Sequence, residues 1–155
     1  MKVPGSDICD SEARVGGVGH ALFRVARAHR AAAARLLREI GLHPGQEIML
    51  GHLADNGETR QSRLVAELGI DPSTVTKMLQ RLERTGLVER RSDPADKRVT
   101  VVAVTDEGKD LLGQIEDRWR RLDAITCAGF TPEDRDDLRR ILSRLEANLA
   151  TCETD

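Results

Sequence analysis

One stretch of this chain, residues 60–98, constrains its fold most strongly, because two short helical patterns are followed at once by a strand pattern. The first helix is expected over residues 61–68, and Gly69 ends it, since glycine adopts the left-handed conformation past a helix end at little cost. Asp71 can then cap a second helix, and Pro72 suits its first position. A short helix, a tight turn and a capped second helix indicate a helix-turn-helix.

The second helix of this pair has two chemically different faces. Its apolar face should pack against a core and carries Val75, Met78, Leu79 and Leu82. Its outer face has no acidic residue, and every side chain on it can donate hydrogen bonds. Such a face fits the major groove of DNA, where it meets base edges and phosphates. The outer face carries Ser73, Thr74, Thr76, Lys77, Gln80, Arg81 and Arg84, and the first six of these are predicted to contact DNA.

After Gly86 the pattern changes to that of a β-hairpin. Leu87 and Val88 begin one strand, residues 99–104 form the other, and turn-forming residues lie between them. A protruding basic hairpin beside a helix-turn-helix is the wing of a winged helix, and an arginine at its tip is attracted into the adjacent minor groove. The residues expected to hold DNA phosphates are Arg60, Gln61, Ser62 and Lys97.

The wing and the helix before it resemble a known family. The run Asp93-Pro94-Ala95-Asp96-Lys97-Arg98, which follows Leu82-Glu83-Arg84-Thr85-Gly86-Leu87-Val88, is similar to the signature of the MarR family, the multiple antibiotic resistance regulators. The likeness extends over roughly residues 18–150 and implies a dimeric winged-helix transcription factor, usually a repressor released by a small molecule or an oxidant. It also implies that Arg98 enters the minor groove and that Asp96 holds the Arg98 guanidinium in place.

The distribution of charge favours nucleic acid as a partner, although the formal net charge of the chain is -2. Residues 60–98 hold nine Lys or Arg and six Asp or Glu, whereas the rest of the chain holds 15 basic and 20 acidic residues. The basic surplus therefore coincides with the proposed DNA contacts, and the local surplus matters more than the total. The remaining alternative for this region is a winged helix that binds a protein.

Three further helices are indicated by their starting residues. Pro44 should open one that runs to about Asp55, with Ile48, Met49, Leu50 and Leu53 buried. After the wing, Thr105 can cap a helix, and Thr131 followed by Pro132 is a strong start for the last one.

The predicted fold class is mainly α with a small β-hairpin wing. Four regions are expected: a flexible N-terminal arm at 1–14, a dimerisation helix at 15–42, the winged helix-turn-helix at 43–104, and C-terminal dimerisation helices at 105–155. The terminal helices carry apolar stripes that must be buried, either against their own domain or against a second chain. We expect a homodimer, which would bind a near-palindromic operator in double-stranded DNA.

The family resemblance also implies a small-molecule effector, often an aromatic acid, held between the dimer helices and the DNA-binding part. Position 43 departs from the family pattern, which usually places a Ser or Thr helix cap there, whereas this chain has a histidine that caps poorly. The candidate ligand-binding residues are Arg24, Arg27, His43, Met49 and Trp119.

Thiol oxidation is the rival trigger. Cys9, Cys127 and Cys152 lie in or next to segments assigned to the dimer end, so thiols of two subunits could approach each other. The peroxide-sensing branch of the family differs from this chain, since its reactive cysteine would fall near Ala21 and its partner tyrosines are missing from a chain without tyrosine.

Other classes of function find little support in the sequence. The nine-residue spacing of His20 from His29, and of His43 from His52, puts each pair on opposite faces of a helix, so no metal or other cofactor is expected. The glycine-rich segment 16–19 lacks the strand and lysine of a phosphate-binding loop, and an enzyme is not expected. Without a long apolar run or a signal-like start, no membrane association is expected and the expected location is the cytoplasm.

Overall fold

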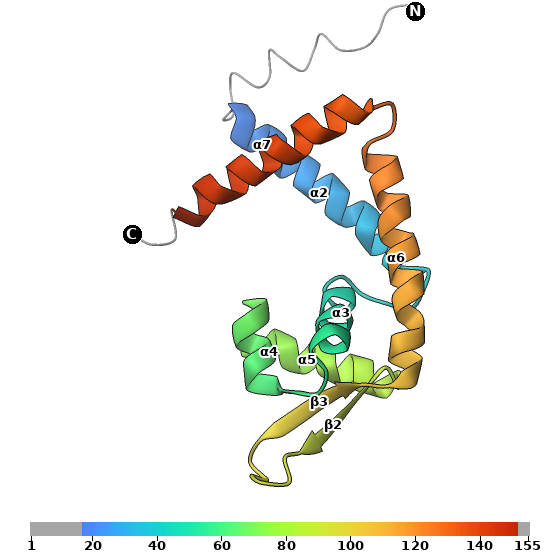
Figure 1. The fold of residues 1–155 in the computed structure, drawn as a ribbon, viewed down its shortest axis with the longest axis vertical. Coiled ribbons are helices and arrows are strands. Elements are labelled where there is room, and N and C mark those ends of the chain that lie inside the picture. The colour runs from blue at the N-terminus through green and yellow to red at the C-terminus, as the bar shows by residue number, and fades with distance from the viewer. Residues whose placement is uncertain (1–16, 152–155) are drawn as a thin grey trace, which may run out of the picture. The chain divides into compact units, whose positions relative to one another are not determined.

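The computed structural model of the chain describes residues 17–151 and is mainly helical with one small sheet, as the sequence predicts (Figure 1). In chain order the elements are α2 (Gly17–Arg38), α3 (Gln46–Asn56), β1 (Thr59–Arg60), α4 (Gln61–Leu68), α5 (Pro72–Arg84), β2 (Val88–Ser92), β3 (Thr100–Val104), α6 (Asp106–Thr126) and α7 (Pro132–Ala150).

The chain divides into two compact units, residues 1–120 and 121–155, with the boundary inside α6. The first unit holds the helix-turn-helix, the sheet, α2 and most of α6, and the second holds the end of α6 and α7. The assignment of residues 15–42 and 105–155 to dimerisation stays a prediction. Within the described residues, no helix is both long and apolar enough to span a lipid bilayer.

The sheet contains three antiparallel strands in the order β1-β3-β2, so β3 is central. Strands β2 and β3 form the expected hairpin, with Val88 opposite Val104 and Ser92 opposite Thr100. Figure 1 shows this hairpin projecting beyond α4 and α5. The two-residue strand β1 was not expected from the sequence, because so short a segment has no detectable alternation of its own.

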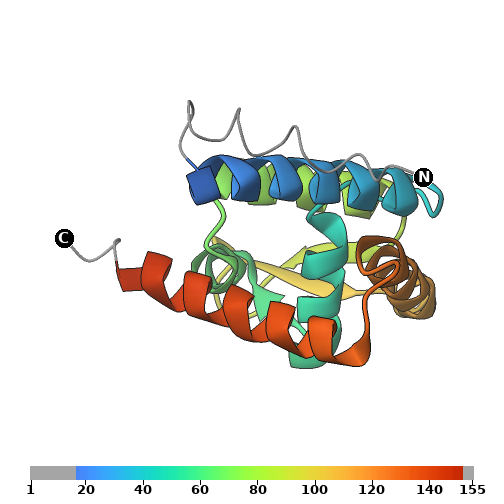
Figure 2. The same ribbon diagram turned by 90° about the horizontal axis from the view of Figure 1, so that it is seen from above.

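The hydrophobic core of the first unit forms around the inner face of α5. Figures 1 and 2 show α3 crossing α5 steeply, while α4 precedes α5 across the tight turn. The buried cluster draws on α2, α3, α4, α5, α6 and the sheet, and it includes three residues of the helix expected to contact DNA. Its members are Leu37, Leu42, Met49, Leu50, Leu53, Leu64, Val75, Leu79, Leu82, Val88, Val102 and Ile115.

Helix α3 differs from the sequence prediction at its start. The helix was expected to begin at Pro44, but it begins at Gln46, because Gly45 takes a left-handed conformation with φ 93°. Ile48 was expected to be buried and is instead 54% exposed. At 100° per residue, Ile48 lies on the side of the helix opposite Leu50 and Leu53, which define its buried face.

The last two helices begin as the sequence predicts. Thr105 caps α6 by accepting a hydrogen bond from the backbone N–H of Gly108 at 3.1 Å. Its hydroxyl also donates to the backbone oxygen of Gly86 at 2.6 Å, which ties the start of α6 to the end of α5. Thr131 and Asp134 form a reciprocal capping box at the start of α7.

We expect Gly108 to be indispensable for this joint, because a Cβ there would lie 2.2 Å from the Leu87 backbone oxygen and 2.6 Å from Cγ2 of Val104. Gly108→Ala should lower the free energy of unfolding by about 1–3 kcal/mol through overpacking. Gly113→Ala is the matched control on the same helix, where a Cβ would meet nothing within 4 Å. It should raise stability by about 0.4–1 kcal/mol. Urea unfolding at one protein concentration gives the free energy of unfolding of both variants and the wild type. Equal changes in the two variants would contradict the close contact at Gly108.

Candidate nucleic-acid interface

The turn between α4 and α5 fixes the start of the helix expected to read DNA. Gly69 adopts the left-handed conformation, with φ 62°, and Pro72 occupies the first turn of α5. The Asp71 carboxylate accepts a hydrogen bond from the Ser73 hydroxyl at 2.6 Å and one from the backbone N–H of Thr74 at 2.9 Å. These donors, Ser73 first and then Thr74, hold the pKa of the Asp71 carboxyl well below its ordinary value.

Helix α5 turns one face to the core and the other to solvent, as predicted. Val75, Leu79 and Leu82 are fully buried. The residues of the predicted DNA-reading face that are exposed are Ser73, Lys77, Gln80, Arg81 and Arg84. None of these five residues is acidic, and the exposed Glu83 at the edge of this face pairs with Arg90. The opposite face of the helix is held in the core.

Thr74 and Thr76, also predicted to contact DNA, are only partly exposed. The Thr76 hydroxyl donates to the Pro72 backbone oxygen at 2.8 Å and accepts from Nε2 of Gln61 at 3.0 Å. Gln61 and Thr76 therefore connect α4 to α5, in addition to any contact either makes with DNA.

The wing tip is shaped by two aspartates that bond to backbone N–H groups. Asp93 accepts from Ala95 at 2.9 Å and Asp96 accepts from Arg98 at 3.0 Å, as is typical of Asp in turns. The family resemblance implied that Asp96 holds the guanidinium of Arg98. In the described part of the chain, Asp96 accepts a hydrogen bond from the backbone N–H of Arg98 and not from its guanidinium. The side chain of Arg98 is exposed.

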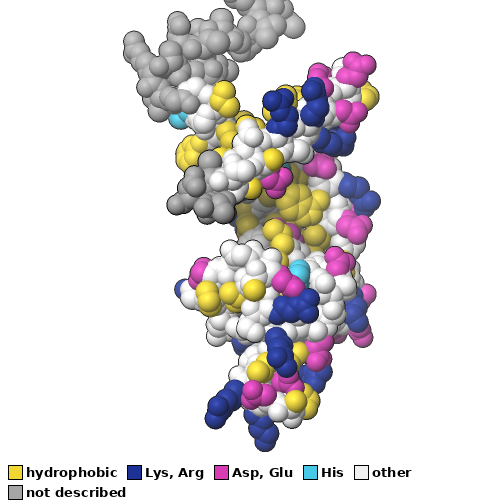
Figure 3. Space-filling view, turned by 60° about the vertical axis from the view of Figure 1, so that its left-hand side comes forward, with side chains coloured by type: hydrophobic (Ala, Val, Ile, Leu, Met, Phe, Trp, Pro, Cys, Tyr) yellow, Lys and Arg dark blue, Asp and Glu magenta, His cyan; other side chains and the backbone are white. Residues whose placement is uncertain are grey.

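The nine basic residues of segment 60–98 fall into two groups. Four arginines form ion pairs: Arg60 with Asp93, Arg63 with Glu67, Arg90 with Glu83, and Arg91 with Glu58. The other five form no ion pair with any residue that the structure describes, and they are Lys77, Arg81, Arg84, Lys97 and Arg98. The unpaired group lies on the outer face of α5 and at the wing tip. Figure 3 shows Lys and Arg side chains projecting around the hairpin, with Asp and Glu side chains among them.

A crevice of about 480 Å³ lies between the start of α4 and the tip end of the wing. It brings three of the predicted contacts together, with Gln61 and Ser62 on the α4 side and Arg98 on the wing side. Its remaining lining is Val65, Pro72, Val99 and Thr100. The crevice has a mixed lining of apolar and polar side chains, and its hydroxyls, its amide and Arg98 are groups that can bind a phosphodiester strand.

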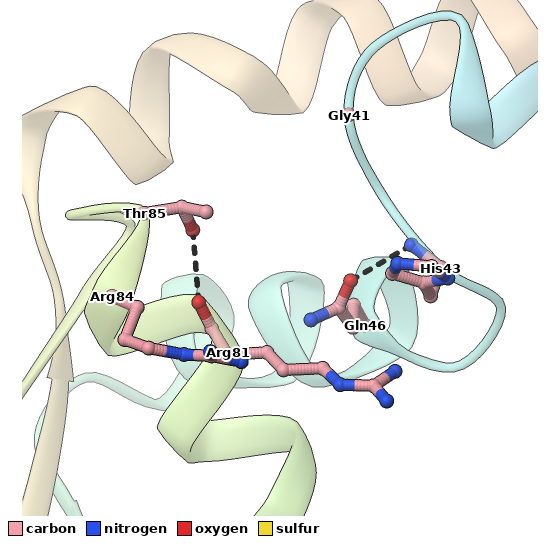
Figure 4. Close-up of a pocket in the computed structure, with 6 residues that line it drawn as sticks. All are labelled: Gly41, His43, Gln46, Arg81, Arg84 and Thr85. Atoms are coloured by element: carbon pink, nitrogen blue, oxygen red, sulfur yellow. Dashed lines mark hydrogen bonds between the residues drawn. The ribbon is translucent and has the colours of Figure 1, made fainter.

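A second pocket, of about 430 Å³, lies between the loop before α3 and the end of α5 (Figure 4). Arg81, Arg84 and His43 border it, and Gln46 lines its inner side. The Gln46 side-chain oxygen accepts the backbone N–H of His43 at 2.7 Å, so Gln46 satisfies the N–H group at the position where the family usually has a Ser or Thr. Arg84 was named on the outer face but not among the predicted contacts, although its spacing from Lys77 and Gln80 could have indicated it.

The other residues expected to hold an effector are dispersed. Arg24 and Arg27 are exposed on α2, whereas Met49 is fully buried in the core. Trp119 is 36% exposed on α6, with its ring 6.4 Å from that of His29.

The described residues include one of the three cysteines of the chain. Cys127 is a partly exposed free thiol, while Cys9 and Cys152 lie outside the described residues, so a thiol trigger stays a prediction. Among residues 17–151, no group of three or more His, Cys, Asp or Glu side chains could hold a metal ion.

Known proteins similar to this chain share its helix-turn-helix and wing. Residues 40–99 match the profile of the MarR family. The chain is 32% identical over 117 residues to the HTH-type transcriptional repressor IacR of Pseudomonas putida. This alignment covers 76% of this chain and 70% of IacR. A crystal structure of MarR, 25% identical, aligns with a TM-score of 0.74 over 90% of this chain and 95% of that one. BpsR of Bordetella bronchiseptica, 27% identical, aligns with a TM-score of 0.72 over 84% and 94% of the two chains.

A helix-turn-helix whose second helix carries an acid-free outer face, followed by a basic hairpin, defines a winged-helix DNA-binding protein. Together with the family profile and the likeness to IacR, this establishes that the chain belongs to the MarR family of transcriptional regulators.

The Asp71 cap generates a pH prediction. A carboxyl whose pKa is lowered on folding adds stability above its ordinary pKa, near pH 4, and this contribution is lost as the pH falls. Asp71→Asn keeps a capping oxygen but carries no charge. The difference in unfolding free energy between the wild type and this variant should therefore be larger at pH 6 than at pH 3. Ser73→Ala should weaken this pH dependence. Urea unfolding at both pH values measures it, and a constant difference would refute the assignment.

Proposed function

We propose that this protein is a homodimeric repressor that binds a near-palindromic operator and leaves it when a small molecule binds. The observation that carries the DNA-binding part is a set of five cations on α5 and the wing tip that pair with no carboxylate among residues 17–151, namely Lys77, Arg81, Arg84, Lys97 and Arg98. Cations without an internal carboxylate partner are available to phosphates, whose binding releases counterions.

In the proposed complex, α5 lies in the major groove with its outer face toward the bases. Lys77, Gln80 and Arg81 are exposed at its centre and can reach base edges or phosphates. Arg98 enters the neighbouring minor groove, and the crevice lined by Gln61 and Ser62 takes the intervening phosphodiester strand.

The homodimer is supported by apolar side chains that the single chain leaves exposed. Val18 and Val25 on α2 are 75% and 62% exposed, and α7 has no buried residue among those described. Exposed apolar residues at helical spacing are favourable only if another surface covers them. A two-fold dimer would place two α5 helices about 34 Å apart, one turn of DNA, on a near-palindromic operator.

Repression and release are proposed from the relatives. IacR is a repressor, and the DNA binding of BpsR is regulated by 6-hydroxynicotinic acid. Among the expected effector residues, His43 borders the pocket that holds Arg81 and Arg84, a setting that suits a carboxylate (Figure 4). A ligand releases DNA only if it binds the DNA-incompatible arrangement of the protein more tightly.

Arg98→Ala tests the DNA-binding mode. In mobility-shift titrations with the DNA upstream of its gene, the wild type should bind in a strongly salt-dependent manner. Arg98→Ala should weaken binding by about 1–3 kcal/mol while leaving the unfolding curve unchanged. Arg139→Ala, an exposed arginine on α7, is the control and should bind like the wild type. Wild-type affinity for Arg98→Ala would refute the wing contact, and salt-insensitive binding would favour a protein-interaction module.

The dimer has its own test. Ile141 and Leu142 on α7 are 49% and 46% exposed, and Leu142→Glu should shift the protein from dimer to monomer in light scattering coupled to size exclusion. Ser143→Glu adds the same charge at the next, exposed position and should leave the dimer intact. A monomeric wild type, or two equally dimeric variants, would contradict the role of this face.

A further inference from the structure

Two ion pairs link the outer strands of the wing sheet across its central strand. Arg60 on β1 and Arg91 on β2 are both register partners of Val101 on β3, so their side chains leave the sheet on the same face. Arg60 pairs with Asp93, just past the end of β2, at 3.2 Å. Arg91 pairs with Glu58, just before β1. Although it lies on this outward face, Val101 is only 6% exposed.

We propose that Arg60 and Asp93 are wing-positioning residues, whose ion pair (the wing brace) holds the wing at the angle from which Arg98 reaches DNA. This inference rests on the proposed DNA-binding function and deepens it. It changes the role expected for Arg60, since a guanidinium bound to Asp93 serves the geometry of the wing rather than a phosphate.

Asp93 is built into the wing more firmly than an ordinary surface acid. Its Oδ1 accepts the N–H of Ala95, its own N–H donates to the backbone oxygen of Val99 at 2.9 Å, and its Oδ2 meets Arg60. Its side chain is 16% exposed. The backbone N–H of Ala95 and then the Arg60 charge lower the pKa of the Asp93 carboxyl, so it is ionised at neutral pH.

The wing brace also connects the two sides of the crevice proposed for the phosphodiester strand. Arg60 directly precedes Gln61 on the α4 side, and Asp93 is hydrogen-bonded to Val99 on the wing side. Loss of the ion pair would therefore let the wing move relative to α4. The crevice would widen, and Arg98 would lose its fixed distance from α5.

The sign of one substitution separates this proposal from its rival. If Asp93 merely neutralised Arg60, Asp93→Asn would free a cation and strengthen DNA binding. If the wing brace positions the wing, the same substitution should weaken binding although it removes a negative charge. Asparagine still offers an oxygen to the Ala95 N–H, so the turn is preserved and the ion pair alone is lost.

The experiment measures operator affinity for the full-length Asp93→Asn, Arg60→Gln and doubly substituted proteins. Each single substitution should weaken binding about two- to fivefold, the range of an exposed ion pair, and the double substitution should add little. Arg63→Gln is the control, because Arg63 lies on α4 but pairs with Glu67 of the same helix, and its effect should be smaller. Unchanged or tighter binding by Asp93→Asn would overturn the proposal.

A second background shows whether the effect passes through Arg98. In an Arg98→Ala protein, Asp93→Asn should cause little further loss, since the side chain that the brace positions is gone. A full additional loss there would mean that Asp93 acts elsewhere, and the proposal would fail.

Amide hydrogen exchange tests the wing brace without DNA. Asp93→Asn should speed exchange over residues 58–61 and 93–101, whereas Arg63→Gln should not. Unchanged exchange would overturn the brace. If exchange rises as expected but the wild type binds no DNA, the brace stands as a structural link and the proposed function fails instead.

Discussion

The burial of one face of α5 is the constraint on which the rest of this structure depends. Val75, Leu79 and Leu82 are fully buried, and they place the same helix at the centre of the core and at the surface proposed for DNA. A helix anchored in this way presents its polar side chains with little freedom to move, and binding then costs less ordering entropy. The cap at Asp71 and the turn at Gly69 determine where the exposed face begins.

Ion pairing divides the basic residues of the winged helix by role. Arginines that meet carboxylates hold elements together, as Arg90 does by pairing with Glu83 of α5 and so joining β2 to that helix. Cations that have no such partner in the described part of the chain are the ones proposed to bind phosphates. A chain with a net charge of -2 can therefore present a basic surface, since 20 of its 26 acidic residues lie outside segment 60–98 and three of the six within it pair with arginines.

The parts of the fold that depend on neighbouring residues could be predicted from the sequence, and the parts that depend on distant ones could not. The caps at Asp71, Thr105 and Thr131 involve partners three residues away, and all three occur as expected. The Arg60–Asp93 pair joins residues 33 positions apart, and no periodicity reveals it. Exposed Ile48 was missed because hydrophobicity alone does not say which side of a short helix faces the core.

The start of α6 connects a helix that is expected to take part in dimerisation with α5, the helix that is expected to contact DNA. Thr105 is bonded to Gly86, and Gly108 lies against the backbone of Leu87, so α6 cannot shift at this point without moving the segment that follows α5. At Gly108 the helix approaches the backbone oxygen of Leu87 without an intervening side chain of its own. An effector or partner chain that redirects α6 would thus act on the segment that follows α5 through these contacts.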